Sequence, residues 1–335
     1  MKLPPFINKG DIIYLVAPSF GCTTEPYHTR LNEAIKNLSN DGYKIIIGSN
    51  CYKAELPYAS NTKELRAKEF MDAYKSNAKV IFSVGGGEMM NEILPFIDFE
   101  EIKNLPPKWF VGFSDNTNLT YTLTIITHIM SLYAINAPDF AFKPYKDATL
   151  DTLLLLQGKK NIISGYKYFE KEKNKSDNPL APLNLTNLKT IKAYNKDLEI
   201  SGRLLGGNLD ILRNLCGTKY DQTKKFIEEI DEPIIWFLEA CDLSPLDIKR
   251  AIFQLTEAGW FKTACCFLIG RSLCMDQEAF GINAYNAYDQ LKEISNNVFL
   301  DVDLGHMAPS MPMICGALAT IKYKSKHKLE IIYKL

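Results

Sequence analysis

The sequence has few of the features that would direct a protein to a membrane or to nucleic acid. Lys and Arg together number 39, as do Asp and Glu, so the formal net charge is zero. Proteins that bind nucleic acid or anionic membranes usually carry a basic excess, and this balance argues against both partners. No apolar run approaches the roughly 18 residues that span a membrane. The apolar stretch 12–17 is also too short for a signal peptide. We therefore expect a soluble, cytoplasmic protein.

The cysteines follow no pattern that is typical of a metal site or a disulfide framework. There are eight of them, but the sequence contains neither a C-x-x-C pair nor an H-E-x-x-H motif. A chain of 335 residues can bury a core without disulfides. Cys265 and Cys266 lie in an apolar stretch, and we expect them to be reduced core residues. The sequence thus predicts no metal site.

Residues 1–142 alternate short apolar runs with longer helical patterns. The runs, which we expect to be strands, are 12–17, 44–47, 80–84, 109–112 and 132–135. The helical patterns between them cover 25–38, 62–76, 88–94 and 116–127. This alternation predicts an N-terminal α/β domain with a parallel sheet, whose ligands bind at the carboxyl ends of the strands.

The rest of the chain divides into a polar stretch and a second domain. Residues 143–197 contain a charged run at 170–175 and prolines within 178–187, so we expect a linker and a surface excursion that is flexible in part. Residues 198–335 are expected to form a second α/β domain rich in strands. Its clearest patterns are strands at 234–238, 266–269 and 328–333 and a helix at 244–258.

Two loops of the first domain could carry chemistry. Ser114 lies in the stretch GFSD between the strand 109–112 and the helix 116–127, where its hydroxyl could be exposed near the positive end of the helix. Asn116 replaces the second glycine of G-x-S-x-G, and Ser114 or Asp115 could instead cap the helix. The three glycines 85–87 form either a tight turn or a close approach to a ligand, such as a backbone N–H that donates to an oxyanion. A phosphate cradle is less favoured, because the P-loop lysine is missing.

Only four histidines could act as a general base. His128 lies in an apolar segment, His327 among lysines and His28 after a turn that contains proline. His306 follows Gly305 in a loop of the second domain and is the best candidate, although a loop histidine is more often a surface residue.

Glu239 ends the apolar strand 234–238, where a carboxylate is costly to bury without a partner. It could orient a histidine, cap the helix that begins near Ser244 or pair with a basic residue. Ser114, Glu239 and His306 occur in the order of an α/β-hydrolase triad. A triad is recognised by its geometry, however, and not by its order alone.

Six stretches occur in order along nearly the whole chain: 10–19 (GDIIYLVAPS), 83–95 (SVGGGEMMNEILP), 112–115 (GFSD), 202–208 (GRLLGGN), 235–239 (IWFLE) and 305–306 (GH). Together they resemble the LD-carboxypeptidase family of serine peptidases, which includes the microcin C immunity peptidases. The resemblance implies a two-domain hydrolase, usually a homodimer, that needs no metal or organic cofactor. Its active site would lie in the cleft between the domains.

The resemblance also implies a role for individual residues. Ser114 would be the nucleophile, His306 the base and Glu239 the acid that orients it. The backbone N–H groups of Gly86 and Asp115 would form the oxyanion hole. Arg203 and Asn208 are weaker candidates for binding a terminal carboxylate of the substrate, and their alternative role is packing between the domains.

The implied reaction is hydrolysis of an amide bond near a terminal carboxylate, in a small peptide or a peptide–nucleotide. Trimming of murein LD-peptides in peptidoglycan recycling and detoxification of a microcin C-like antibiotic both stay open. The length of the 143–196 excursion resembles the microcin branch, which typically has a tryptophan there that stacks on the nucleobase. Here the excursion has no tryptophan, and its aromatic candidates are Tyr166, Tyr168, Phe169 and Tyr194. A two-domain protein that binds a small ligand without catalysis is the alternative.

Overall fold

The computed structural model describes residues 1–193 and 198–335, which divide into two compact units. Unit 1 contains Met1–Lys160 and Lys173–Leu183, and unit 2 contains Asn161–Glu172 and Asn184–Leu335. The stretch 143–197, expected as a linker and excursion, therefore contributes to both units. Tyr194, one of the aromatic candidates, lies outside the described residues.

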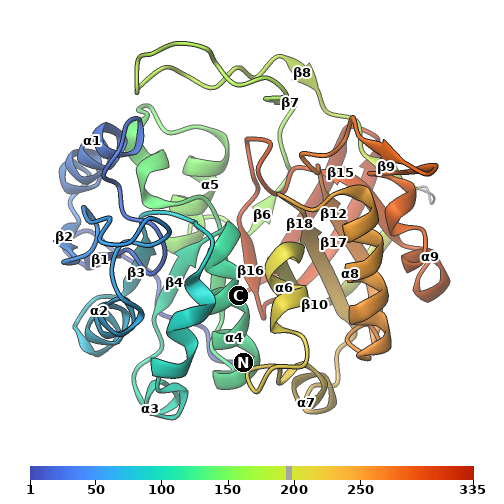
Figure 1. Ribbon diagram of the computed structural model, residues 1–335, viewed down its shortest axis with the longest axis horizontal. Helices are drawn as coiled ribbons and strands as arrows, with labels where there is room; N and C mark the ends of the chain where they lie inside the picture. The colour runs from blue at the N-terminus through green and yellow to red at the C-terminus, as the bar shows by residue number, and fades with distance from the viewer. Residues whose placement is uncertain (194–197) are drawn as a thin grey trace. The chain divides into compact units, whose positions relative to one another are not determined.

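Unit 1 is built on a parallel sheet whose strands lie in the order β2-β1-β3-β4-β5 (Figure 1). The strands are β1 (Ile12–Val16), β2 (Lys44–Ile47), β3 (Val80–Ser83), β4 (Trp109–Gly112) and β5 (Ser131–Tyr133). Every residue of β3, β4 and β5 is buried, as is typical of parallel strands covered on both faces. The predicted α/β class with a parallel N-terminal sheet is confirmed.

Helices connect and cover these strands. They are α1 (Tyr27–Asn40), α2 (Lys63–Lys75), α3 (Phe99–Asn104), α4 (Thr117–Thr127) and α5 (Asp147–Leu156), with 3₁₀ helices η1 (Met90–Phe96), η2 (Ser114–Asn116) and η3 (Ala137–Ala141). In α1, the buried residues Leu31, Ala34 and Leu38 recur at helical spacing and form its inner face. The helix expected at 88–94 is the 3₁₀ helix η1, which contains Pro95; a proline cannot donate the hydrogen bond of an α-helix.

Unit 2 is built on a mixed sheet in the order β6-β18-β17-β10-β11-β12-β15-β9. Its central strands β10 (Leu198–Asn208), β11 (Ile234–Glu239), β12 (Ala264–Gly270) and β15 (Val298–Val302) are parallel. The flanking strands β6 (Ile162–Ile163), β9 (Lys192–Ala193), β17 (Leu318–Ser325) and β18 (Lys328–Lys334) pair antiparallel to their neighbours. The carboxyl ends of the four parallel strands lie at one edge of this sheet.

Shorter elements complete unit 2. The strands are β7 (Tyr168–Phe169), β8 (Asn187–Leu188), β13 (Glu278–Ala279), β14 (Ile282–Asn283) and β16 (Met313–Cys315). The helices are α6 (Leu209–Leu215), α7 (Thr223–Glu228), α8 (Pro245–Glu257), α9 (Leu291–Ile294) and the 3₁₀ helix η4 (Asn286–Tyr288). In the amphipathic helix α8, Ser244 is the N-cap and its hydroxyl accepts a hydrogen bond from the backbone N–H of Asp247.

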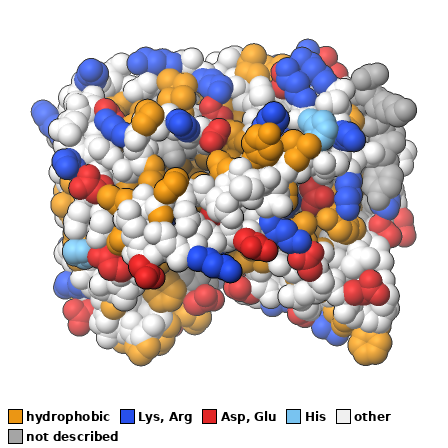
Figure 2. Space-filling view, turned by 90° about the horizontal axis from the view of Figure 1, so that it is seen from above, with side chains coloured by type: hydrophobic (Ala, Val, Ile, Leu, Met, Phe, Trp, Pro, Cys, Tyr) orange, Lys and Arg blue, Asp and Glu red, His pale blue; other side chains and the backbone are white. Residues whose placement is uncertain are grey.

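The described surface agrees with the even charge balance of the sequence. Figure 2 shows Lys and Arg side chains interleaved with Asp and Glu side chains on the face in view. No helix within residues 1–193 and 198–335 is long and apolar enough to cross a membrane.

The contact between β10 and β11 depends on a glycine. A Cβ at Gly206 would lie 1.8 Å from the backbone oxygen of Phe237, and its φ of +151° is one that L side chains rarely adopt. The ring of Trp236, the residue before Phe237, stacks on that of Trp260 with centroids 5.9 Å apart. The stretch GRLLGGN therefore has a structural requirement for glycine where β10 approaches its neighbour.

We expect Gly206→Ala to lower the free energy of unfolding by about 3 kcal/mol or more, because the new methyl group meets backbone that cannot move aside. Gly217→Ala is the matched control: its φ is +81°, but a Cβ there has no atom within 4 Å. It should cost only about 1 kcal/mol of backbone strain. Urea unfolding of both full-length variants measures the difference, and equal losses would contradict the steric explanation.

Candidate active site

Ser114 occupies a strained turn between β4 and α4. Its φ is 64°, which is uncommon for a residue other than glycine and typical of strained functional turns. The Ser114 backbone N–H donates to the hydroxyl oxygen of Tyr133 at 3.1 Å. Asn116, whose Nδ2 donates to the carbonyls of Phe113 and Gly85 at 2.9 and 3.0 Å, holds the turn from inside. Since Asn116 is the N-cap of α4, neither Ser114 nor Asp115 caps this helix.

The buried carboxylate of Asp115 joins the loops around this turn. Its Oδ2 accepts from the Ser19 hydroxyl at 2.5 Å and from the Met90 N–H at 2.9 Å. Its Oδ1 accepts from Nδ2 of Asn118 at 2.8 Å. Burial raises the pKa of Asp115 to about 6, although the bonds from Ser19 and Met90 oppose the rise. The segments that follow β1, β3 and β4 are thereby connected through one carboxyl group.

Gly86 lies directly against Ser114. A Cβ on Gly86 would be 3.0 Å from the Cβ of Ser114 and 3.1 Å from its Oγ. The carbonyl of Gly86 accepts from the N–H of Phe20 at 3.1 Å, which connects this glycine to the loop after β1. Unit 1 thus brings together three of the predicted site residues: Gly86, Ser114 and Asp115.

Unit 2 brings together three other predicted site residues, since His306 and Asn208 both contact the carboxylate of Glu239. This side chain ends β11 and is completely buried. Its Oε2 lies 3.0 Å from Nδ1 of His306, and its Oε1 accepts from Nδ2 of Asn208 at 3.0 Å. Asn208 lies directly opposite Glu239 in the β10–β11 register, and its Oδ1 also accepts from the N–H of Ile211 at the start of α6. The sequence allows Glu239 to orient a histidine, to cap a helix or to pair with a basic residue. In the structure its partner is the histidine, His306.

The His306 loop can approach this carboxylate because Gly305 precedes it. A Cβ at Gly305 would lie 2.7 Å from Oε2 of Glu239. Burial by itself would lower the pKa of His306, but the Glu239 carboxylate and the neighbouring Cys241 side chain raise it well above its usual 6.5. The surroundings of His306 therefore favour the charged form of its imidazole. The side chain is 18% exposed.

Arg203 has different surroundings. Its Nη2 and Nε contact the Glu232 carboxylate at 2.7 and 3.2 Å, and its Nη1 donates to the Gly316 carbonyl at 2.6 Å. The side chain is almost completely buried. These contacts are those of a packed ion pair inside unit 2, and a role for Arg203 in substrate binding stays a prediction.

Three neighbours of the site were not singled out from the sequence. Ser19 lies within the stretch 10–19 that carries the family resemblance, so that motif was a usable signal. Tyr133 ends the strand after β4, but nothing in its pattern indicates a contact with Ser114. Cys241 follows Glu239 by two positions. Burial raises the pKa of the Cys241 thiol, and its contact with the His306 imidazole opposes that rise. Only the folded arrangement reveals these last two.

Comparison with known proteins gives matches over both units. The model described as the LD-carboxypeptidase N-terminal domain matches residues 13–134, and that of the LD-carboxypeptidase C-terminal domain matches residues 201–321. The microcin C7 self-immunity protein MccF of Escherichia coli is 26% identical over 95% of this chain and 92% of its own. A Bacillus subtilis protein named "Probable murein peptide carboxypeptidase" is 25% identical over 96% and 92%.

Solved structures agree with these matches at the level of the fold. The structure of MccF in complex with glutamyl sulfamoyl guanosine has a TM-score of 0.82 at 23% identity, covering 98% of each chain. The muramoyltetrapeptide carboxypeptidase of Oxalobacter formigenes has a TM-score of 0.70 at 20% identity, covering 97% of this chain and 99% of that one. The predicted family resemblance and fold are confirmed.

The pKa of His306 can be measured directly by NMR titration of its ring protons. We expect a value above 6.5 in the unaltered chain, because the Glu239 carboxylate stabilises the imidazolium. In Glu239→Gln the charge is removed while the shape is kept, so the pKa of His306 should fall clearly below that of the unaltered chain. Glu232→Gln, which removes a carboxylate that pairs with Arg203 instead, is the control and should leave it unchanged. A His306 pKa that does not respond to Glu239→Gln would contradict this account.

Proposed function

We propose, on the premise that this chain belongs to the LD-carboxypeptidase family and is a serine-type peptidase, that it cleaves an amide bond near a terminal carboxylate with a Ser114–His306–Glu239 triad. The observation that carries the proposal is the 3.0 Å contact between the buried Glu239 carboxylate and Nδ1 of His306. A buried carboxylate in this position orients the imidazole and stabilises its protonated form. The strained turn at Ser114 supports the role of nucleophile.

In the first half of the reaction, Ser114 Oγ attacks the substrate carbonyl carbon while Nε2 of His306 takes the hydroxyl proton. Nε2 has this role because Nδ1 faces Glu239. The carbonyl oxygen becomes an oxyanion, to which the N–H groups of Gly86 and Asp115 donate. His306 then gives its proton to the leaving amine, and an acyl-enzyme ester of Ser114 remains.

In the second half, water replaces the amine. His306 takes a proton from the water, whose oxygen attacks the ester carbonyl, and the proton returns to Ser114 Oγ as the acid product leaves. Glu239 stays ionised throughout and keeps the imidazole in the required tautomer. Asn208, which donates to the other oxygen of Glu239, acts in this scheme as a positioning residue.

The scheme requires contributions from both units, since Ser114 belongs to unit 1 and His306 and Glu239 belong to unit 2. The predicted cleft between the domains is therefore part of the proposal, as is the expectation that activity depends on both units. The homodimer and the cytoplasmic location stay predictions from the sequence.

Two substrate classes are supported by the names of relatives that are about a quarter identical to this chain. One relative is named as a murein peptide carboxypeptidase and the other as a microcin C7 self-immunity protein. The substrates we propose are accordingly a murein LD-peptide with a free carboxyl terminus and an aminoacyl or peptidyl nucleotide. Both contain an amide-type bond that the proposed triad can attack.

A double-mutant comparison tests whether residues of the two units act together. Ser114→Ala and His306→Ala should each lower kcat/KM by about 10⁴-fold or more, and the double variant should lose little beyond the worse single variant. Such non-additivity is expected when a nucleophile and its base act as one unit. Ser39→Ala, an exposed position in α1, is the control and should keep full activity. Retained activity in Ser114→Ala, or multiplied losses in the double variant, would contradict the triad.

The substrate assignment is tested by direct assay of the purified chain. We expect release of the terminal residue from a murein LD-tetrapeptide, of the amino acid from an aminoacyl sulfamoyl adenosine, or of both, as measured by mass spectrometry. The same tetrapeptide with its carboxyl terminus amidated is the matched control. This amidated peptide should be cleaved about 10- to 100-fold less well, because it lacks the charged carboxylate that would accept hydrogen bonds from the protein. No cleavage of either substrate would remove both assignments.

A further inference from the structure

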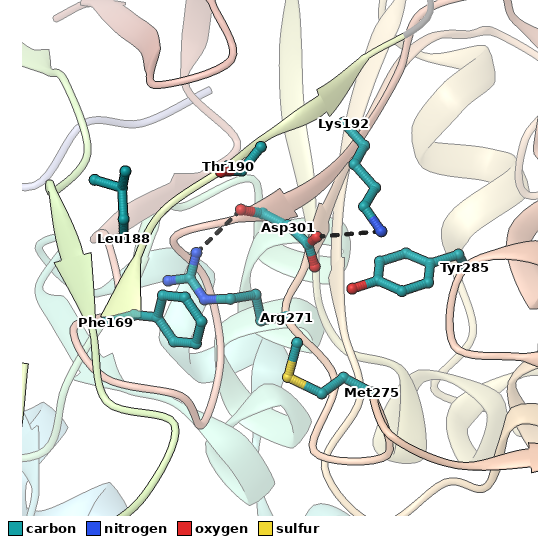
Figure 3. A pocket seen from close by; sticks show the side chains of 8 residues that line it. All are labelled: Phe169, Leu188, Thr190, Lys192, Arg271, Met275, Tyr285 and Asp301. Atoms are coloured by element: carbon teal, nitrogen blue, oxygen red, sulfur yellow. Dashed lines mark hydrogen bonds and ion pairs between the residues drawn. The ribbon is translucent and has the colours of Figure 1, made fainter. Parts of the chain in front are cut away.

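Unit 2 contains a cavity of about 210 Å³ that the proposed chemistry does not use (Figure 3). It lies by the carboxyl ends of β12 and β15, and half of its lining comes from the short strands and loops of residues 169–192. The other half comes from residues 271–301. A segment expected as a partly flexible surface excursion therefore forms one wall of a cavity within this unit.

The cavity has an apolar part and a charged part. Phe169, Leu188 and Met275 supply the apolar surface, whereas Lys192, Arg271 and Asp301 supply the charges. In Figure 3 the apolar group Phe169 and Leu188 lies on one side of Arg271, with Lys192 and Tyr285 on the other. A ligand that fits both parts must itself be amphipathic.

The charges around the cavity do not cancel. Behind its wall, the buried carboxylate of Asp303 contacts both Arg271 and Lys189 at 2.7 Å. Within the cavity, the carboxylate of Asp301 faces Lys192 at 4.0 Å. Three cations thus share two carboxylates, which leaves one positive charge uncompensated in partly buried surroundings. An anion that enters the cavity would balance this charge.

Arg271 lines the cavity with a guanidinium group that has one unsatisfied donor within the described residues. The side chain is almost completely buried, and its Nη1 donates to the backbone carbonyl of Asp301 at 3.0 Å. Its Nε is buried and has no hydrogen-bond partner in the described part of the chain. The ring of Phe169 covers the guanidinium, with the centroid 4.4 Å from Cζ. Arg271 therefore lines the cavity beside an aromatic ring and keeps one donor of its guanidinium group without a partner among residues 1–193 and 198–335.

Lys192 is the cation that can reach a ligand. Its side chain is 49% exposed, and Nζ lies 3.0 Å from the centroid of the Tyr285 ring. Burial and the nearby carboxylate of Asp301 raise the pKa of the Tyr285 hydroxyl to about 12. Lys192 thus holds its charge at the cavity surface, where Asp301 is its nearest anionic competitor.

We propose that this cavity binds a small organic anion, a carboxylate or a phosphate monoester, attached to an apolar group of about the size of one ring. The anionic group pairs with Lys192 in the positive field of Arg271, and the apolar group packs on Phe169, Leu188 and Met275. The inference goes beyond the proposed function, because the binding involves neither Ser114 nor Glu239 nor His306.

Three ring compounds test the site: benzoate, phenyl phosphate and the uncharged benzamide. Binding to the full-length chain is measured by saturation-transfer NMR and by shifts of assigned amides, and the same titration is done with Ser114→Ala. We expect at least one of the two anions to bind at least about tenfold more tightly than benzamide, a ratio that corresponds to one charge-assisted contact. The Ser114→Ala variant should bind equally well, so this test does not depend on the peptidase activity.

Two substitutions locate the site. Lys192→Met should weaken binding of the anions by about tenfold, whereas Asp301→Asn should strengthen it several-fold by removing the competing carboxylate. Asp301 has a φ of 60°, which asparagine adopts readily, so this variant should fold. Lys262→Met, at an exposed position of unit 2, is the control and should change nothing. Equal affinity for benzamide and both anions, or no response to Lys192→Met, would overturn the proposal; the better of the two anions identifies the ligand class.

Discussion

A carboxylate with no exposed surface, that of Glu239, imposes a constraint on everything around it in unit 2. Burying an ionised carboxyl group costs several kcal/mol unless its oxygens find partners. Here one oxygen faces His306 and the other accepts from Asn208, so the ends of β10 and β11 and the loop after β15 are all held to one group. Gly305 makes the approach of that loop possible. Asp115 does the same in unit 1, where its carboxyl joins the loops after three neighbouring strands.

Much of unit 1 could be predicted because its apolar runs are short and clearly separated along the chain. β2 and β4 have the bounds that the sequence indicates, and the other strands of the sheet differ by only one or two residues at their ends. Glycine and serine motifs at the ends of these strands were also informative, since only a few residue types tolerate a strained turn such as that of Ser114. The pairing of Glu239 with a histidine was one of several options, because a strand pattern cannot indicate which distant loop meets its end.

The remaining structure depends on contacts that leave no local pattern. The helix α5 lies inside the stretch expected as a linker, although its buried leucines 153, 155 and 156 are a signal that its polar neighbours obscured. The strands β7, β8 and β9 have two residues each, too few for any periodicity. The hydrogen bond between Ser19 and Asp115 joins residues 96 positions apart, and the one between Asn208 and Glu239 joins residues 31 positions apart.

The excursion and the His306 loop are connected more closely than either sequence pattern indicates. Asp303, three residues before His306, accepts from the backbone N–H of Tyr166 and from Lys189, which lie on the two arms of the excursion. Two residues after His306, the carbonyl of Ala308 accepts from the N–H of Glu170. A buried ionic contact on one side of the loop and a backbone hydrogen bond on the other limit its movement. The excursion is therefore tied to the loop that carries the imidazole, so a change in its contacts with Asp303 or Ala308 also acts on the geometry of His306.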